Sequence, residues 1–299
     1  MQAPPIRIEV SLSEDTLSLG EPIVLQYRFV GTQAEEVHFY MGRDKKGWLS
    51  LILADAQRNT APAIPDPRMR QGGIYSYGMS ASATSHATEY VVATRLVRPM
   101  HPGDYQLSAS ARMPYAMKSQ SEGVWPYLWE QTYGTVLTRE DTFALTFTAL
   151  DPNRLRTVAE RLAATAAQDD DRVRGTVALQ SLFSMPGEYV FPVWQEVTRS
   201  ENPNLLDRWG VISDELARVQ SIETANILSE MVWNPPLAVR ERLKIVLGPF
   251  GLNVMAMNNV AMKFNNMYFT ADPTLKQHIT GMYLARGSTA PQTPITIID

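Results

Sequence analysis

The sequence predicts a protein of two parts, an antiparallel β-sandwich followed by an α-helical domain. Apolar and polar residues alternate in many short segments of the first half, which is typical of half-buried strands. In the second half, apolar residues instead recur at helical spacing. The change occurs at Leu150-Asp151-Pro152-Asn153, where Asp151 suits a helix N-cap and Pro152 suits the first helical position.

The strand with the clearest pattern follows a Pro-Gly turn at Pro102-Gly103. Its apolar side holds Tyr105, Leu107, Ala109, Ala111 and Met113, and polar residues occupy the positions between them. Such alternation indicates a strand with one face on a core and one face in water. Similar patterns predict strands at 6–12, 23–30, 37–41, 48–53, 89–97 and 142–149. Many short alternating strands separated by turn residues favour a sandwich of two sheets.

Two long segments, 55–87 and 114–140, interrupt the predicted sandwich. The first is rich in proline and glycine, and the second is rich in aromatic residues. Loops of this length inside a compact domain are usually functional or disordered, and aromatic richness argues against disorder. We therefore predict a sandwich domain over 1–150 with these two insertions. A helical domain should follow over 151–286, and the tail 287–299 is expected to be extended.

The helical half repeats itself at intervals of similar length. Three apolar sets share one helical face: Leu205, Trp209, Ile212 and Leu216; Val239, Leu243 and Val246; Leu275, Ile279 and Met282. Val173 and Val177 begin a similar face nearer the start of this half. A further helix is expected before each set, centred near Leu162, Val197, Met231 and Phe264. Stacked helix pairs of this period would place Trp209, Leu243 and Ile279 in equivalent buried positions.

Two places in the first half resemble the immunoglobulin-like superfamily as it occurs in bacterial exported proteins. Gly20-Glu21-Pro22-Ile23-Val24-Leu25 resembles the start of the second strand. Gly103-Asp104-Tyr105-Gln106-Leu107 resembles the tyrosine corner that opens the sixth strand. The resemblance covers residues 5–150 and implies that Leu25 and Leu107 stand at the family's cysteine positions. Apolar packing would then replace the disulfide bridge. The resemblance implies a fold and not an activity.

The helix pairs of the second half resemble HEAT or armadillo-type repeats. Asp171-Arg172-Val173-Arg174 resembles the start of a HEAT second helix, and the resemblance covers residues 153–286. The repeats are degenerate, so a helical bundle without a solenoid remains an alternative.

Composition excludes several classes of partner and chemistry. The net charge is −4 with no basic stripe, which argues against nucleic acid and anionic membrane surfaces as partners. No apolar run approaches the roughly 18 residues of a membrane-spanning helix. The chain has no cysteine, which excludes disulfides, thiol nucleophiles and cysteine-ligated zinc. Its start, Met1-Gln2-Ala3-Pro4-Pro5, is similar to a mature N-terminus after signal cleavage, so we expect a periplasmic or extracellular protein.

No motif of catalysis or metal binding is present in the sequence. The histidines His38, His86, His101 and His278 stand apart, without a second histidine or a carboxylate at metal-helix spacing. Asp169-Asp170-Asp171 lacks the glycine and the distal glutamate of a calcium loop, and we expect it to cap a helix. There is no phosphate-binding loop and no nucleophile elbow. We therefore predict no catalytic residue, no metal ligand and no cofactor.

The strongest candidates for ligand contact are the aromatic residues of the second insertion: Trp125, Tyr127, Trp129 and Tyr133. They could stack on a sugar or anchor a partner protein, or they could instead cover the edge of the sandwich. The sequence favours a non-catalytic binding or scaffolding protein. The alternatives are a carbohydrate-binding module that uses these aromatics, and an enzyme or enzyme inhibitor with a site in a cleft between the domains.

Overall fold

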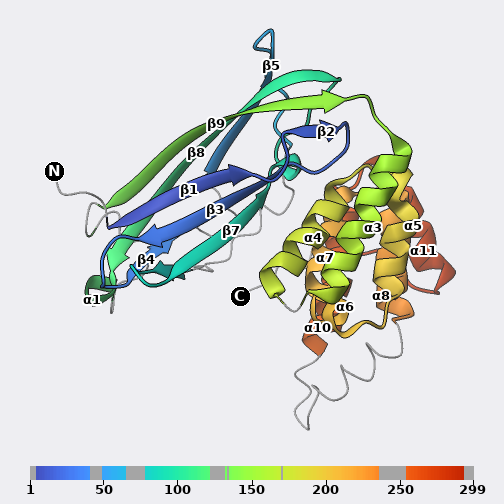
Figure 1. Ribbon diagram of the computed structural model, residues 1–299. Coiled ribbons are helices and arrows are strands. Elements are labelled where there is room, and N and C mark those ends of the chain that lie inside the picture. Colours follow the sequence, from blue (N-terminus) through green and yellow to red (C-terminus); the bar gives the residue numbers. More distant parts are fainter. Residues whose placement is uncertain are drawn as a thin grey trace. The chain divides into compact units, whose positions relative to one another are not determined.

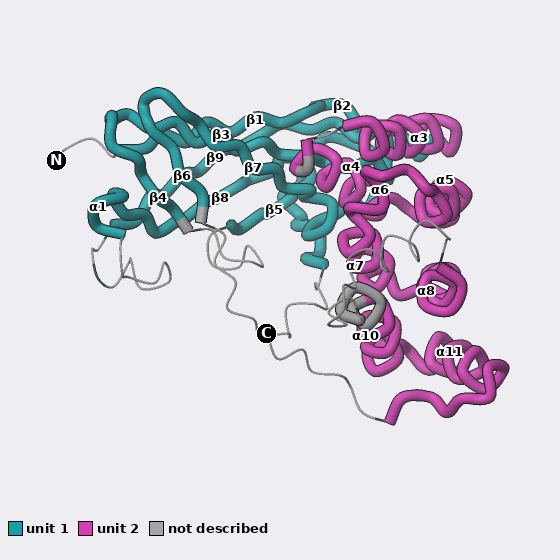
Figure 2. Tube along the Cα trace, turned by 90° about the horizontal axis from the view of Figure 1, so that it is seen from below, with its two compact units in different colours: residues 1–65, 72–151, 299 teal, residues 66–71, 152–298 magenta. Residues whose placement is uncertain are grey.

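The computed structural model describes residues 5–40, 49–64, 78–121, 132, 135–169, 171–235 and 254–292. The described chain forms two compact units that divide between Asp151 and Pro152. The strands lie in the first unit and the long helices in the second (Figures 1 and 2). The protein therefore combines a unit of sheets with a unit of long helices.

Unit 1 consists of two facing sheets. Its described strands are β1 (Ile6–Leu12), β2 (Thr16–Ser18), β3 (Val24–Gly31), β4 (Val37–Tyr40), β5 (Leu49–Asp55), β6 (Gly78–Ala81), β7 (His86–Val92), β8 (Gly103–Met117) and β9 (Val136–Thr148). One sheet has the order β1-β3-β7 and is antiparallel. The other has the order β2-β9-β8-β4-β6, and β5 also pairs with β8.

The two sheets share one hydrophobic core, built from the inward side chains that the alternating pattern predicts. Leu25 on β3 and Leu107 on β8 are both fully buried in this core, and they belong to opposite sheets. On β8, Ala109, Ala111 and Met113 are buried as well, because successive side chains point to opposite faces of a strand.

The start of the chain crosses from one sheet to the other. β1 pairs with β3 in the smaller sheet, whereas β2 pairs in parallel with β9 in the larger sheet. The crossing occurs at Ser13–Asp15. The sequence analysis missed β2, because a strand of three residues is too short to show a period.

The insertion predicted at 55–87 is wrong in part. β6 and the start of β7 lie inside it, and both strands pair with neighbours in the sheets. Their small and polar residues hide the alternation that identifies a strand. β7 also ends earlier than predicted, at Val92, where the short 3₁₀ helix η2 (Ala93–Arg95) follows.

The insertion predicted at 114–140 is shorter in the structure, since β8 continues to Met117 and β9 begins at Val136. The sequence analysis treated Pro114 as the end of the strand. The amide of Tyr115 points toward β9, so the missing amide of Pro114 falls on the other side of β8. On that side the pairing of β5 ends at Ala111 and that of β4 begins at Tyr115. The proline therefore breaks no described ladder bond.

Unit 2 consists of helices in two rows. Its described helices are α3 (Pro152–Gln168), α4 (Arg172–Ser184), α5 (Gly187–Arg199), α6 (Pro203–Asp207), α7 (Trp209–Val219), α8 (Ile222–Trp233), α10 (Val254–Thr270) and α11 (Pro273–Ala285). One row holds α3, α5, α8 and α11, and the other holds α4, α7 and α10 (Figure 2). None of the described helices is long and apolar enough to cross a lipid bilayer.

The predicted equivalence of Trp209 and Ile279 is wrong, although both are buried. Trp209 lies on α7 and Ile279 on α11, in different rows. The third predicted position, Leu243, lies outside the described residues. The even spacing of the apolar sets predicted the wrong row, because α10 begins only at Val254 and lies next to α7. Val173, assigned to a buried face, is 39% exposed.

Candidate functional site

The four predicted contact residues, Trp125, Tyr127, Trp129 and Tyr133, lie outside the described residues. The structure does describe both ends of the connection that carries them. β8 leads into the single turn α1 (Lys118–Ser121), and the chain returns at Thr135 to begin β9. The structure therefore shows how the two ends of the segment that carries the candidate site are held.

The two ends of this connection are joined by backbone pairing. The amide of Tyr115 donates to the carbonyl of Thr135 at 3.2 Å, and the Thr135 hydroxyl donates to the carbonyl of Tyr115. One step further into the ladder, Met113 pairs with Leu137, and both side chains are buried in the core. The aromatic segment thus follows β8 and precedes β9, and the bonds between Tyr115 and Thr135 hold the ends of these two neighbouring strands together.

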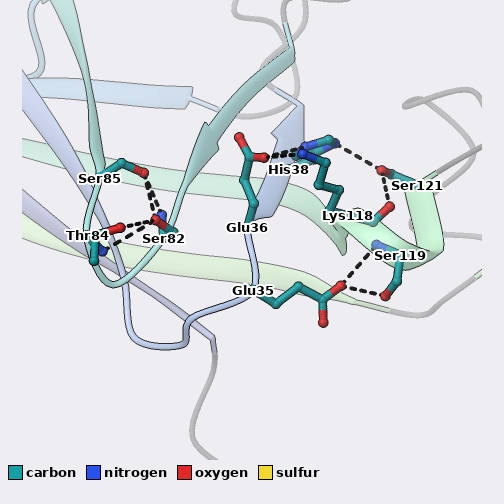
Figure 3. A network of polar contacts seen from close by, with 9 residues as sticks. All are labelled: Glu35, Glu36, His38, Ser82, Thr84, Ser85, Lys118, Ser119 and Ser121. Carbon is teal, nitrogen blue, oxygen red and sulfur yellow. Dashed lines mark hydrogen bonds and ion pairs between the residues drawn. The ribbon is translucent and has the colours of Figure 1, made fainter.

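Helix α1 is fastened to the loop between β3 and β4 (Figure 3). The amide and the hydroxyl of Ser119 donate to Oε1 of Glu35, at 3.0 and 2.5 Å. The ammonium of Lys118 lies 3.0 Å from Oε2 of Glu36, and the Lys118 amide donates to the Glu36 carbonyl at 2.9 Å. Two carboxylates therefore hold the first turn of the connection.

His38 extends the same network from the start of β4. Its Nδ1 lies 2.9 Å from the hydroxyl of Ser121, at the end of α1, and its Nε2 lies 3.8 Å from Oε2 of Glu36. The Ser121 hydroxyl also lies 2.9 Å from the carbonyl of Lys118. The imidazole thus packs the end of α1 against β4.

A third connection, the turn between β6 and β7, meets the β3–β4 loop at the same end of unit 1. The amide of Ala83 donates to the carbonyl of Gln33 at 2.8 Å. A Cβ on Gly31 would lie 2.5 Å from the backbone of Ser82, so only glycine permits this approach. The hydroxyls of Ser82 and Ser85 lie 2.8 Å apart within the turn (Figure 3). We call residues 31–36, 82–85 and 118–121 together the loop end.

Hydrogen bonds lower the pKa of both carboxyls of the loop end. A hydrogen bond from Ser80, and then the hydrogen bond and charge of Lys118, lower the pKa of Glu36 to about 2. The hydrogen bonds from Ser119 lower the pKa of Glu35. Effective general bases have a pKa near the working pH, so these carboxylates are poor candidates for proton transfer. Their geometry instead suits them to positioning the connection.

We expect the attachment of α1 to weaken as the pH falls from about 5 toward 2. The folded-state pKa of Glu36 lies below that of the unfolded chain, so its contribution to stability is present above the unfolded value and is lost during acidification. The protection factors of the α1 amides, which compare the observed exchange rate with the intrinsic rate at the same pH, should therefore fall over this range. In Glu36→Gln, protection at α1 should already be low at neutral pH and should change less with acid. A wild-type protection factor that stays constant from about pH 5 toward 2 would contradict this role of Glu36.

His101, His278 and Asp171 each contact a polar group in their own unit. His101 Nε2 lies 3.8 Å from a carboxylate oxygen of Asp55, and His278 Nε2 lies 2.8 Å from the side-chain oxygen of Asn226. Asp171 caps α4 by accepting from the amide of Val173 at 2.8 Å, as the sequence predicts. Among the described residues, no three histidine, aspartate or glutamate side chains gather in a way that could hold a metal ion.

The sequence analysis missed every member of the loop end. Lys118 and Glu36 are 82 positions apart, and neither stands in a motif or in a periodic pattern. Two acidic residues at 35–36 and a serine-rich segment at 119–121 are common features of surface loops. Only the strand pairing that aligns β4 with the end of β8 brings them together.

Comparison with known proteins identifies no family. No family model matches the chain, and no curated protein matches it. Among solved structures, a complex of zinc 2-glycoprotein with prolactin inducible protein from human seminal plasma matches with a TM-score of 0.25 and 11% identity. That match covers 47% of this chain and 93% of the other.

Two bacterial α-2-macroglobulins also match. The native E. coli protein has a TM-score of 0.25 and 9% identity over 98% of this chain, and a mutant of the Salmonella protein has 0.26 and 10% over 97%. This chain spans 23% of the length of each macroglobulin. These TM-scores are too low to assign a fold or a function.

Proposed function

We propose that the protein is a non-catalytic binding protein that contacts a partner protein through the connection between β8 and β9. In this proposal, unit 1 is an immunoglobulin-like domain and unit 2 is a HEAT-like helical repeat. The contact residues are Trp125, Tyr127, Trp129 and Tyr133, and the loop end is their support. Export to the periplasm or the cell exterior belongs to the same proposal and can be tested by cell fractionation.

The strand pairing supports the immunoglobulin-like assignment. Constant-type immunoglobulin sandwiches pair their first, second, fourth and fifth strands in one sheet, and their third, sixth and seventh in the other. Here β1-β3-β7 make one sheet and β5-β8-β9 lie together in the other, which matches that pairing except that β6 pairs with β4 in the larger sheet. The hydroxyl of Tyr105 donates to the carbonyl of His101 at 3.1 Å, which is the bond of a tyrosine corner.

The arrangement of unit 2 supports the repeat assignment. α3, α5 and α8 begin at nearly even intervals, at Pro152, Gly187 and Ile222, and each packs against the next. In the other row, α4 packs against α7 and α7 against α10. Two parallel rows in which each helix contacts its row neighbours are the arrangement of stacked helix pairs.

The observation that carries the proposal is the set of hydrogen bonds at the start of the aromatic connection. Three connections meet at the loop end: hydrogen bonds join the first turn of the aromatic one to the β3–β4 loop, and that loop is joined in turn to the β6–β7 turn. In variable immunoglobulin domains, the loops at one end of the sandwich bind the ligand, and the connection between the last two strands is one of them. Binding through a loop is stronger when its ends are already ordered, because less conformational entropy is lost. Aromatic residues supply large contact area for such binding.

The proposal is tested with the full-length triple variant Trp125→Ala, Tyr127→Ala, Trp129→Ala on peptide and glycan arrays. We expect the wild type to bind a set of peptides with dissociation constants in the micromolar range, and the triple variant to lose at least about tenfold in affinity. Met100→Ala is the matched control. It removes an apolar side chain that is 69% exposed, next to the strand end opposite α1, and should leave binding unchanged.

Equal binding by the triple variant and the wild type would reject the proposed contact residues. Glycans bound by the wild type and lost in the triple variant would favour the carbohydrate-binding alternative over a protein partner. Binding lost equally in Met100→Ala would show a non-specific apolar contact.

A further inference from the structure

Strand β9 has one edge that is only partly paired. β8 pairs with it along one side from Val136 to Phe147. On the other side, β2 pairs with Thr146–Thr148, and no other described strand lies along the remainder. Within the part of the chain that the structure describes, this edge has no partner strand over 138–144, because the chain crosses from β1 in the other sheet to β2 at Ser13–Asp15. An open sheet edge is a template for a further strand.

Some amides and carbonyls of β9 point away from β8, toward the unpaired edge. The amide of Thr146 points away from β8, since it donates to the carbonyl of Asp15 at 2.8 Å. Alternate residues of a strand direct their amides and carbonyls to the same side. The amides and carbonyls of Thr142 and Ala144 therefore face outward as well.

These outward groups border a hollow of about 550 Å³. Its lining consists of Leu12, Ser13, Glu14, Asp15, Thr142, Phe143 and Ala144. Leu12 and Phe143 are half-buried and pack against the hydrophobic core of unit 1. The hollow is thus bordered by outward backbone groups of β9 and by two apolar side chains.

The charge around the open edge is acidic. Asp15 and Glu140 are exposed, and the hollow has no basic side chain in its lining. Arg139, the nearest basic residue along β9, is held by both carboxylate oxygens of Asp141, at 2.8 and 2.5 Å. A strand that binds here would meet negative charge that Arg139 does not neutralise.

We propose that the open edge of β9 binds an extended segment of a partner protein in which apolar and basic residues alternate. The segment adds as a strand next to 138–144 and pairs with the outward backbone groups of Thr142 and Ala144. Its apolar side chains cover Leu12 and Phe143, and its basic side chains lie near Asp15. This surface is separate from the loop end and does not depend on the function proposed there.

The test uses the full chain and a labelled peptide of alternating valine and lysine, with fluorescence anisotropy as the measurement. Thr142→Pro removes one outward amide and leaves the pairing with β8 intact, so we expect about tenfold weaker binding. Thr142→Val is the matched control, since it keeps the amide, and it should bind like the wild type. Asp15→Asn should weaken binding about threefold.

Hydrogen exchange in the wild type gives a second measurement that does not require Thr142→Pro to fold. Added peptide should protect the amides of Thr142 and Ala144 and leave those of the loop end unchanged. The proposal is overturned if neither amide is protected, if Thr142→Pro binds like the wild type, or if a valine–glutamate peptide binds equally well. A dimer of the chain that Thr142→Pro dissociates would also overturn it, because the occupant would then be a second copy.

Discussion

Replacing Arg208 by methionine is expected to lower the free energy of unfolding of unit 2 by about 3–5 kcal/mol. Arg208 is 4% exposed, and its guanidinium is surrounded by backbone carbonyls. Nη1 donates to Ala166 and Asn204 at 3.2 and 3.0 Å, and Nη2 donates to Asp169 and Asp171 at 2.9 and 3.1 Å. Methionine fills much of the same space but leaves these carbonyls without their donor. Urea unfolding followed by circular dichroism measures the loss.

Two glycine-to-alanine substitutions test the same site: the added Cβ would meet Arg208 in one of them and no atom in the other. A Cβ on Gly175 would lie 2.3 Å from Cζ of Arg208, and the guanidinium cannot move without losing its bonds. Gly175→Ala should therefore destabilise unit 2. Gly210→Ala, also in a helix but with no atom near the added Cβ, should stabilise it by about 0.5–1 kcal/mol. The account is contradicted if the two alanine variants change the free energy of unfolding equally, or if Arg208→Met unfolds at the same urea concentration as the wild type. Either result would show that the guanidinium does not stabilise the contact between these segments.

Leu107→Ala is expected to destabilise unit 1 by about 2–5 kcal/mol. Leu107 lies on β8, between β5 and β9, and its side chain is fully buried in the core that both sheets share. Truncation leaves a cavity that rigid sheets on both sides cannot close. Hydrogen exchange of the β8 amides in increasing urea gives the local free energy of unfolding.

Ile52→Ala is the control for this substitution. Ile52 lies on β5 and pairs with Ser108, the residue next to Leu107, but its side chain is 50% exposed. Its loss should change stability by less than about 0.5–1 kcal/mol. A cost below about 1 kcal/mol for Leu107→Ala would contradict the assignment of this leucine to the centre of the core.

Period-two alternation identified β1, β3 and β8 because each has one face on the core and one in water. For the same reason the burial of Leu25 and Leu107 could be predicted from sequence. Asp171 was assigned as a cap because an aspartate before a helical pattern has one favoured role.

Features that depend on distant partners could not be predicted in this way. Arg208 is a charged residue beside an apolar set, and nothing local shows that carbonyls from two other segments enclose it. The contact of Lys118 with Glu36 depends on the register between β4 and β8. The row of α10 could not be predicted from the even apolar spacing, because α10 begins only at Val254 and lies next to α7.

The proposed contact requires the aromatic side chains of the β8–β9 connection to be exposed. It is tested most directly by acrylamide quenching of tryptophan fluorescence in the wild type and in Trp125→Phe, Trp129→Phe. Trp194 and Trp209 are buried in unit 2 and provide a shielded reference within the same chain. We predict that the readily quenched fraction is smaller in the double variant than in the wild type, while the half-buried Trp233 contributes to both proteins. If the quenched fraction is the same in both proteins, Trp125 and Trp129 are shielded in the free protein, and the proposed contact is wrong.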